Sequence, residues 1–254
     1  MDVIVLAGGF ATRLRPLSEY IPKPLFPLGG VPILNYIVYK IEEEIKPGRI
    51  IISTNKRFEN HFRYWKRCLF DELKQKIELI SEPTYKNEEK FGAIRGLYYA
   101  IKEAWIENDL LVIAGDNFFD FDLRKIRRLM KEKNAITLSL YNLKSLEEAK
   151  RFGVVSIDSD NRIIELYEKP ENPKSTLIST GIYAIPKEKL RFLEEYIHTN
   201  NEQDVLGKFF EWLLNREPLY GYPYEGVWFD IGTLDSYKEA NEYVMKKGLF
   251  WRWI

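Results

Sequence analysis

The chain has 254 residues, of which 38 are Lys or Arg and 38 are Asp or Glu, so its formal net charge is zero. Hydrophobic residues make up 45% and charged residues 30%, a balance typical of a folded globular protein and not of a disordered one. A neutral chain excludes a broad positive field, so we expect no nucleic-acid or membrane partner, and any basic site must be local.

Neither a targeting signal nor paired cysteines can be found in the sequence. Met1 leads directly into an apolar run without a basic leader, and no apolar run approaches the length of a membrane span, which predicts a cytoplasmic protein. Cys68 is the single cysteine, which excludes an intrachain disulfide and a cysteine metal cage. Abundant Lys and Glu with few Cys and Gln is also typical of a heat-adapted source.

Strand-like and helix-like segments alternate through the first half of the chain. Short buried strands that alternate with helices predict βαβ units, and hence an α/β fold with a mostly parallel, doubly wound, Rossmann-like sheet. The expected strands are Val3–Ala7, Arg49–Ser53, Ile77–Ile80 and Leu110–Ala114, and the expected helices are Ile33–Glu44, Phe58–Leu69 and Ala93–Ile106.

The second half of the chain changes character. Val154–Ile157 and Arg162–Tyr167 flank a polar turn, which predicts a β-hairpin added to the sheet. No linker rich in Gly or Ser separates the halves, so we expect a single domain in which both halves share one sheet. The other expected strands are Ser179–Ala184 and Val227–Phe229, and the expected helices are Lys187–Tyr196, Gln203–Leu214 and Thr233–Lys246.

A glycine loop follows the first expected strand. Ligands of open parallel sheets bind beyond the carboxyl ends of the strands, and the adjacent Gly8 and Gly9 let backbone N–H groups approach phosphate oxygens. The loop lacks the third glycine of the dinucleotide fingerprint and the Gly-Lys-[Ser/Thr] ending of the P-loop. Thr12, Arg13 and later Lys23 follow instead, which favours a polyphosphate site over a tight turn with solvated basic side chains.

Several ordered motifs extend over nearly the whole chain. They are Leu6–Pro16, Pro22–Leu25, Gly92–Leu97, Gly115–Asn117, Gly153–Val155, Glu168–Pro170, Thr180–Tyr183 and Trp228–Thr233. The first two correspond to the signature Leu-Ala-Gly-Gly-x-x-Thr-Arg-Leu-x-Pro and a Pro-Lys-Pro-Leu segment. Together the motifs resemble those of the sugar nucleotidyltransferase family that includes the glucose-1-phosphate thymidylyltransferases.

This resemblance implies a fold, a reaction and a set of site residues. The fold is that of the nucleotide-diphospho-sugar transferases, and the reaction moves a nucleotidyl group from a nucleoside triphosphate to a sugar 1-phosphate with Mg²⁺ as cofactor. A nucleotide-binding part is implied at about 1–135, a sugar-binding part at about 136–233, and a C-terminal helix and tail at 234–254. The implied nucleotide-binding residues are Leu6, Ala7, Gly8, Gly9, Thr12, Arg13, Lys23, Glu82, Gly92, Ala93 and Gly115. The implied sugar-phosphate residues are Asn117, Gly153, Glu168, Lys169, Gly181, Tyr183 and Trp228. Catalysis is assigned to Arg13, Lys23, Asp116 and Lys169, and the metal to Asp116 and Asp230.

Two aspartates are candidates for the metal on chemical grounds as well. Asp116 and Asp230 each follow an apolar run, so we expect both carboxylates at the ligand edge of the sheet. With no His or Cys nearby in sequence they suit a hard ion such as Mg²⁺, while a helix cap or an Asx turn is the alternative for each. Asp120 and Asp122 match the Asp-x-Asp string of glycosyltransferases, but Asp122 stands directly before a helical run and is expected to be its N-cap.

The implied chemistry requires no general base, because the attacking sugar-phosphate oxygen is already anionic. Catalysis then consists of holding two polyanions together and stabilising the spread charge. Arg13 would hold the leaving pyrophosphate, Lys23 the triphosphate, and Lys169 the attacking phosphate. Neighbouring residues of a strand point to opposite faces, so at least one of Glu168 and Lys169 is expected to be solvated. Trp228 is expected to belong to the core rather than to form a sugar platform.

The nucleobase is less well determined by the sequence. Thymidylyl- and uridylyltransferases of this family typically read the base with a Gln shortly before the glycine that corresponds to Gly92, whereas Ser81–Phe91 holds no Gln and is longer. Glu82 cannot donate a hydrogen bond when ionised, so it is not a neutral substitute. Glucose 1-phosphate with dTTP is the expected pair, with UTP or GTP as alternatives. A glycosyltransferase or a catalytically silent subunit on the same fold are the rival classes.

The end of the chain predicts assembly. Large apolar side chains surround Arg252, and such groups usually mark contact surfaces when they are exposed. The alternative is a tail that folds back on its own subunit. Because related enzymes are commonly homo-oligomers, we expect a homo-oligomer whose interface includes Phe250, Trp251 or Trp253.

Overall fold

The computed structural model of the protein describes residues 1–199 and 204–249. Phe250, Trp251 and Trp253, which the sequence places at a subunit interface, lie outside the described residues. Within the described ranges, no helix has the length and apolar character needed to cross a membrane.

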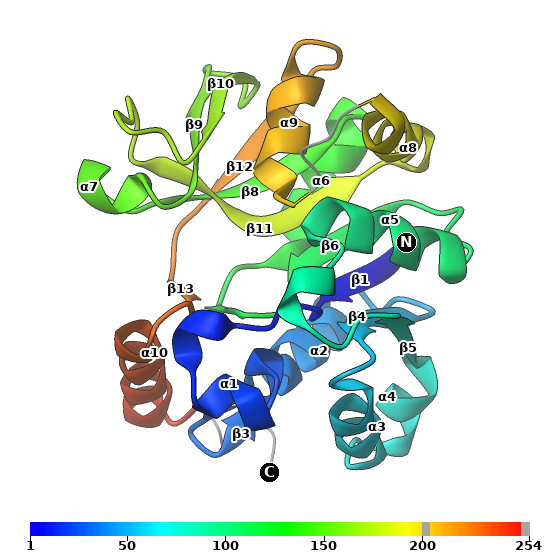
Figure 1. Ribbon diagram of the computed structural model, residues 1–254. Coiled ribbons are helices and arrows are strands. Elements are labelled where there is room, and N and C mark those ends of the chain that lie inside the picture. The colour runs from blue at the N-terminus through cyan, green and yellow to red at the C-terminus, as the bar shows by residue number, and fades with distance from the viewer. Residues whose placement is uncertain (200–203, 250–254) are drawn as a thin grey trace.

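A nine-stranded, mostly parallel sheet lies at the centre of the described structure (Figure 1). Its main run places the strands in the order β5, β4, β1, β6, β11, β8 and β12, and β11 is antiparallel to both of its neighbours in that run. A hairpin of β9 and β10 branches from the start of β11, as the sequence predicts. The strands are β1 (Asp2–Leu6), β4 (Ile50–Asn55), β5 (Ile77–Glu82), β6 (Leu110–Ala114), β8 (Thr137–Asn142), β9 (Gly153–Ile157), β10 (Ile163–Glu168), β11 (Leu177–Ile185) and β12 (Tyr220–Tyr224).

Helices cover both faces of the sheet, and alternate residues of one strand show why. Val3 and Val5 belong to one buried cluster, whereas Ile4 between them belongs to the other, because successive side chains of a strand point to opposite faces. The first cluster includes side chains of α2 (Ile33–Glu44), α3 (Glu59–Arg67), α4 (Asp71–Lys76), α6 (Leu123–Lys133) and α10 (Leu234–Lys247). The second includes α5 (Ala93–Glu103), α8 (Arg191–Thr199) and α9 (Leu206–Leu214). The fold class predicted from the sequence is thereby confirmed.

Short elements connect these layers. They are the 3₁₀ turns η1 (Thr12–Leu14), η2 (Lys23–Leu25), η3 (Asn87–Glu89) and η4 (Lys187–Lys189), the helices α1 (Leu17–Tyr20) and α7 (Leu146–Ala149), and the two-stranded ribbon of β2 (Pro27–Leu28) and β3 (Val31–Pro32). The remaining strands, β7 (Asn117–Phe119) and β13 (Trp228–Asp230), form a second antiparallel ribbon outside the main sheet.

Strands from both halves of the chain do share one sheet, because β6 pairs with β11 through the register Ile113 to Ile182. The division of the chain into functional parts stays a prediction. The expected strand at Val227–Phe229 does not join the main sheet, as its residues pair with β7 instead. Strands β8 and β12 were not among the expected elements. In β12 the sequence Tyr-Gly-Tyr-Pro-Tyr argues against a strand, but Pro223 is tolerated because β12 lies at the end of the run and pairs only with β8.

The Asp-x-Asp string has a structural role, as its spacing before a helix predicts. Asp122 accepts a hydrogen bond from the backbone N–H of Arg124 at 3.0 Å and caps α6. Asp120 accepts one from the backbone N–H of Val227 at 2.7 Å. The expected N-cap is confirmed, and both carboxylates are used in local structure.

Candidate active site

Two neighbouring cavities open along the carboxyl ends of β1 and β6. The large cavity, of about 500 Å³, includes Ala114 at the end of β6, and the small cavity, of about 200 Å³, includes Leu6 at the end of β1. Leu6 and Ala114 are register partners, and the N–H of Gly115 donates to the Leu6 carbonyl at 2.9 Å. The cavities therefore flank one pair of strand ends, the edge at which open parallel sheets bind ligands.

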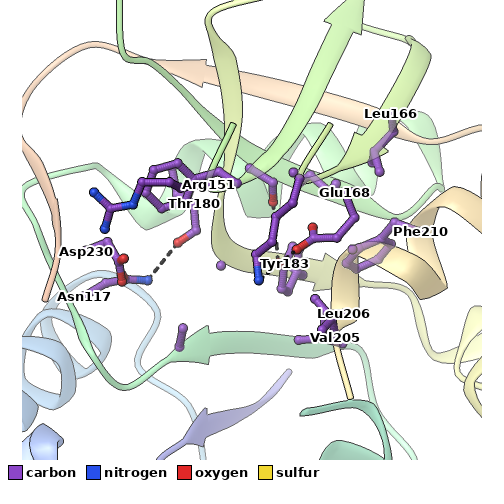
Figure 2. Close-up of a pocket in the computed structure, with 18 of the residues that line it drawn as sticks. Asn117, Arg151, Leu166, Glu168, Thr180, Tyr183, Val205, Leu206, Phe210 and Asp230 are labelled. Atoms are coloured by element: carbon purple, nitrogen blue, oxygen red, sulfur yellow. Dashed lines mark hydrogen bonds and ion pairs between the residues drawn. The ribbon is translucent and has the colours of Figure 1, made fainter. Parts of the chain in front are cut away.

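The large cavity lies between β9, β10 and β11 on one side and α9 and β13 on the other (Figure 2). Asn117 forms part of its floor and donates from Nδ2 to the backbone carbonyl of Thr180 at 2.8 Å. Gly181 follows with a φ of 80°, and a side chain there would stand 2.9 Å from the Ala114 Cβ and 3.1 Å from Asn117 Nδ2. A glycine is thus required for this strand to approach β6 so closely.

Glu168 and Lys169 both line the large cavity, which differs from the alternation expected of a strand. Lys169 has a φ of 49°, so the chain leaves the extended conformation at this residue, and its N–H donates to the Phe152 carbonyl at 3.0 Å. The turn brings Lys169 Nζ to 3.6 Å from Glu168 Oε1. Burial raises the pKa of Glu168, and the charge of Lys169 opposes that rise. The cavity therefore presents an acid and a base on the same side.

Aromatic side chains form the apolar walls of the large cavity. The rings of Tyr183 and Phe210 lie 4.6 Å apart, and burial raises the pKa of the Tyr183 phenol to about 12. Trp228 is 8% exposed, as the sequence predicts for a core residue, and packs edge-on against Phe152 with ring centroids 5.3 Å apart. Its Nε1 is buried without a hydrogen-bond partner in the part of the chain that the structure describes. Trp228 thus belongs to the core and also lines the cavity.

Asp116 and Asp230 meet beside the large cavity, although they come from different elements. Asp230 ends β13 and is the register partner of Asn117, so the β7–β13 ribbon, not a second strand of the main sheet, carries it to Asp116. Lys23 Nζ lies 2.5 Å from Asp116 Oδ2. Burial raises the pKa of Asp230 to about 6, the charge of Asp116 adds to that rise, and Lys23 is among the cations that oppose it. The carboxylates are therefore close enough to repel each other.

This pair of carboxylates fits a magnesium ion. Asp116 and Asp230 are hard oxygen ligands whose mutual repulsion a divalent cation would relieve. The described residues contain no cluster of three or more metal-binding side chains, so the remaining positions would belong to substrate phosphates and water, which is how Mg²⁺ is usually held.

Arg151 is a cation of the site that the sequence did not reveal. It lines the large cavity with Arg13, and both oppose the raised pKa of Asp230. Figure 2 shows its guanidinium directed toward Asp230. Arg151 stands two residues before the Gly153 motif, and this position was the available signal. Lys150, Ser179 and the first turn of α9 also line the cavity without having been predicted.

The small cavity is lined largely by the glycine loop and the start of α5. Its lining residues are Leu6, Gly8, Gly9, Ser53, Glu82, Lys90, Gly92, Ala93, Gly96 and Asp204. Asn55 Nδ2 donates to the Gly8 carbonyl at 2.9 Å and holds the loop in place. Gly92 precedes α5 with a φ of 80°, a conformation that side chains rarely adopt.

The structure brings most of the predicted site residues to the two cavities. Leu6, Gly8, Gly9, Glu82, Gly92 and Ala93 line the small cavity, and Arg13, Asp116, Asn117, Gly153, Glu168, Lys169, Gly181, Tyr183, Trp228 and Asp230 line the large one. Four predicted residues line neither: Ala7 is buried, Thr12 is exposed in η1, Gly115 forms the turn after β6, and Lys23 pairs with Asp116.

A backbone-lined cavity, a basic and acidic junction and a polar aromatic cavity, all at one sheet edge, define a class of enzymes that bring two phosphorylated substrates together. The chain belongs to the nucleotidyl transferase family, whose model matches residues 2–247. This confirms the family that the motifs indicate.

Similar proteins agree with this assignment. The chain is 34% identical over 251 residues, which is 97% of its length, to the bifunctional protein GlmU of Methanocaldococcus jannaschii, of which it covers 55%. It is 30% identical over 242 residues to a Sulfolobus acidocaldarius protein assigned as a mannose-1-phosphate guanyltransferase, with coverage of 95% of the chain and 62% of that relative. A Bacillus anthracis protein assigned as a glucose-1-phosphate thymidylyltransferase, crystallised with a sucrose, superposes with a TM-score of 0.79 and 26% identity, covering 96% of this chain and 94% of the other. The chain spans little more than half the length of the curated relatives it matches.

Proposed function

We propose that the protein transfers a nucleotidyl group from a nucleoside triphosphate to a sugar 1-phosphate and releases pyrophosphate. One observation carries the proposal: the carboxylates Asp116 and Asp230 and the cations Lys23, Arg13 and Arg151 gather at one site beside the cavities. This arrangement suits two polyanions that must meet although their charges repel.

In the proposed reaction, a phosphate oxygen of the sugar 1-phosphate attacks the α-phosphorus of the triphosphate. A new P–O bond forms there, and the bond between the α-phosphorus and the bridging oxygen to the β-phosphorus breaks, so the electron pair leaves with pyrophosphate. No proton has to be removed from the nucleophile. The protein therefore contributes position and charge stabilisation rather than a general base.

The side chains divide between the two substrates. The small cavity would take the base, with the glycine loop directing its N–H groups at the phosphates. Arg13 would hold the leaving pyrophosphate and Lys23 the triphosphate near the reacting phosphorus. In the large cavity Lys169 would seat the attacking phosphate, and Glu168, 10% exposed at its side chain, would accept hydrogen bonds from sugar hydroxyls.

Asp116 and Asp230 would hold Mg²⁺, which when bound supplies positive charge to the phosphate oxygens. Lys23 would then turn from Asp116 toward the phosphates, because a divalent cation replaces it as the partner of the carboxylate. The pairing of Lys23 with Asp116 keeps the ammonium beside the reacting position until the triphosphate enters.

For the sugar we propose glucose 1-phosphate, which the likeness to the Bacillus anthracis protein supports. Mannose 1-phosphate is the comparison, since the Sulfolobus acidocaldarius relative is assigned to it. We further propose a cytoplasmic homo-oligomer, supported by the apolar end of the sequence. Light scattering on the full chain and on a form that ends at Lys247 tests the assembly, and a full-length monomer at micromolar concentration would contradict it.

The test of the reaction is pyrophosphate release over a grid of nucleoside triphosphates and sugar 1-phosphates, with and without Mg²⁺. Product must require both substrates and must contain one phosphate from each. Lys169→Ala is the site variant, and Lys174→Ala, an exposed lysine a few residues further on, is its matched control. Release of nucleoside diphosphate instead of pyrophosphate, or activity without a sugar 1-phosphate, would refute the proposal.

A further inference from the structure

A buried carboxylate faces the cavity that the proposed function assigns to the nucleobase. Glu82 is the last residue of β5, lines the small cavity and is 6% exposed. The backbone N–H of Phe91 and the charge of Arg95 favour its ionised form. The described residues line this cavity with no other carboxylate except Asp204, which lies 3.6 Å from Lys90 as an ion pair.

Two glycines make room for this side chain. A Cβ at Gly96 would lie 2.4 Å from Glu82 Oε1, and one at Gly8 would lie 3.2 Å from the same oxygen. The carboxylate is thus packed against the glycine loop on one side and the first turns of α5 on the other. Its position is fixed by the backbone of three elements, so it is a built part of the cavity wall and not a side chain that happens to turn inward.

The chemistry of this group selects among bases. An ionised carboxylate only accepts hydrogen bonds. Guanine presents two adjacent donors, N1–H and the N2 amino group, which match the two oxygens of one carboxylate. Uracil and thymine present one N–H between two carbonyl oxygens, and these oxygens would be repelled by it. Bidentate hydrogen bonds to a charged group are also stronger than those between neutral groups.

We propose that Glu82 is the specificity-determining residue of the nucleotide site and that it selects guanosine triphosphate over the pyrimidine triphosphates. The proposal rests on the proposed function, and it departs from dTTP, the substrate expected from the family resemblance. A glutamine at this position would present one donor and one acceptor, as uracil and thymine require. A glutamate with the same shape therefore inverts the preference.

The ionisation of Glu82 agrees with this assignment and adds a signature. Burial raises its pKa to about 7, so the acceptor-only form dominates above pH 7 and a form that can donate appears below it. The titratable and charged groups that face Glu82 are Arg95 and Tyr99 of α5, and Lys90 with Asp204 across the cavity. Preference for GTP over UTP should therefore rise between pH 6 and pH 8.

The experiment compares kcat/KM for GTP, UTP and dTTP at pH 6, 7 and 8 in the wild-type protein, Glu82→Gln and Glu88→Gln, together with calorimetric binding of each triphosphate. Glu88 is an exposed glutamate of the same loop and serves as the matched control. We expect the wild-type protein to prefer GTP at pH 8 by about tenfold or more, and Glu82→Gln to lose most of that preference and its pH dependence. Selective binding of GTP without any turnover would refute the proposed reaction but support the role of Glu82. Preference for UTP or dTTP at pH 8 in the wild-type protein, or an unchanged preference in Glu82→Gln, would overturn the proposal.

Discussion

The buried Glu82 carboxyl should make the stability of the protein depend on pH in a way that one substitution of equal shape removes. Burial raises its pKa from the ordinary value of 4.5 to about 7 in the folded chain. Between these two values the folded chain holds a proton that the unfolded chain has released. The corresponding stabilisation is fully present below about pH 4.5 and is lost as the pH rises through 7.

The size of the effect follows from the two pKa values. Each unit of pKa corresponds to about 1.4 kcal/mol, so the difference between 4.5 and about 7 corresponds to about 3 kcal/mol as an order of magnitude. Glu82→Gln does not ionise and keeps the shape of the side chain. Relative to wild type, its free energy of unfolding should therefore increase by about 3 kcal/mol between pH 4.5 and pH 8, or roughly 6–12 °C in Tm for a chain of this size.

Urea unfolding at pH 4.5, 6, 7 and 8, followed by tryptophan fluorescence, measures this difference. Glu88→Gln removes one carboxylate from the same loop, but its side chain is exposed, so its difference from wild type should stay constant over the series. A difference between Glu82→Gln and wild type that changes by less than about 1 kcal/mol would show that burial does not hold the proton on Glu82. The measurement is independent of whether the base is guanine.

Three further substitutions test the site. Asp230→Asn should keep the fold and reduce turnover roughly hundredfold or more, because the amide loses the charge that would hold Mg²⁺; near wild-type activity at limiting Mg²⁺ would exclude it as a ligand. Lys169→Ala should mainly raise KM for the sugar 1-phosphate, whereas Arg13→Ala should mainly lower kcat, and equal effects on both constants in both variants would remove this division of roles. Gly207→Ala places a Cβ 1.9 Å from a carboxylate oxygen of the large cavity, so sugar-phosphate KM should rise about tenfold with little change in Tm, whereas Gly48→Ala, with no atom within 4 Å, should change neither.

The glycine substitution separates function from stability because of what the added methyl would meet. At Gly207 the nearest atoms belong to the end of the Glu168 side chain, which can turn away at little cost to folding. Turning away would remove the acceptor proposed for the sugar hydroxyls. A large fall in Tm for Gly207→Ala would instead place the clash on a group that cannot move, and the structural assignment of Glu168 would be wrong.

Sequence alone determined the features whose physical causes are local. The bounds of α2 and β6 match the expected Ile33–Glu44 and Leu110–Ala114, because apolar periodicity and flanking breakers act over a few neighbouring residues. The cap at Asp122 was predictable for the same reason. The ordered motifs also identified the family, and they located residues that line both cavities.

Tertiary structure alone decided what distant segments do to one another. No local pattern shows that the β7–β13 ribbon brings Asp230 to Asp116, or that a positive φ turns Lys169 to the side of Glu168. Likewise the sequence showed a glutamate at position 82, but its burial against Gly8 and Gly96 depends on the packing of three elements. Desolvation and charge interactions depend on which atoms lie within a few ångströms, and residues far apart in the chain supply most of those atoms, so the pKa values and the chemistry of the site arise only in the folded protein.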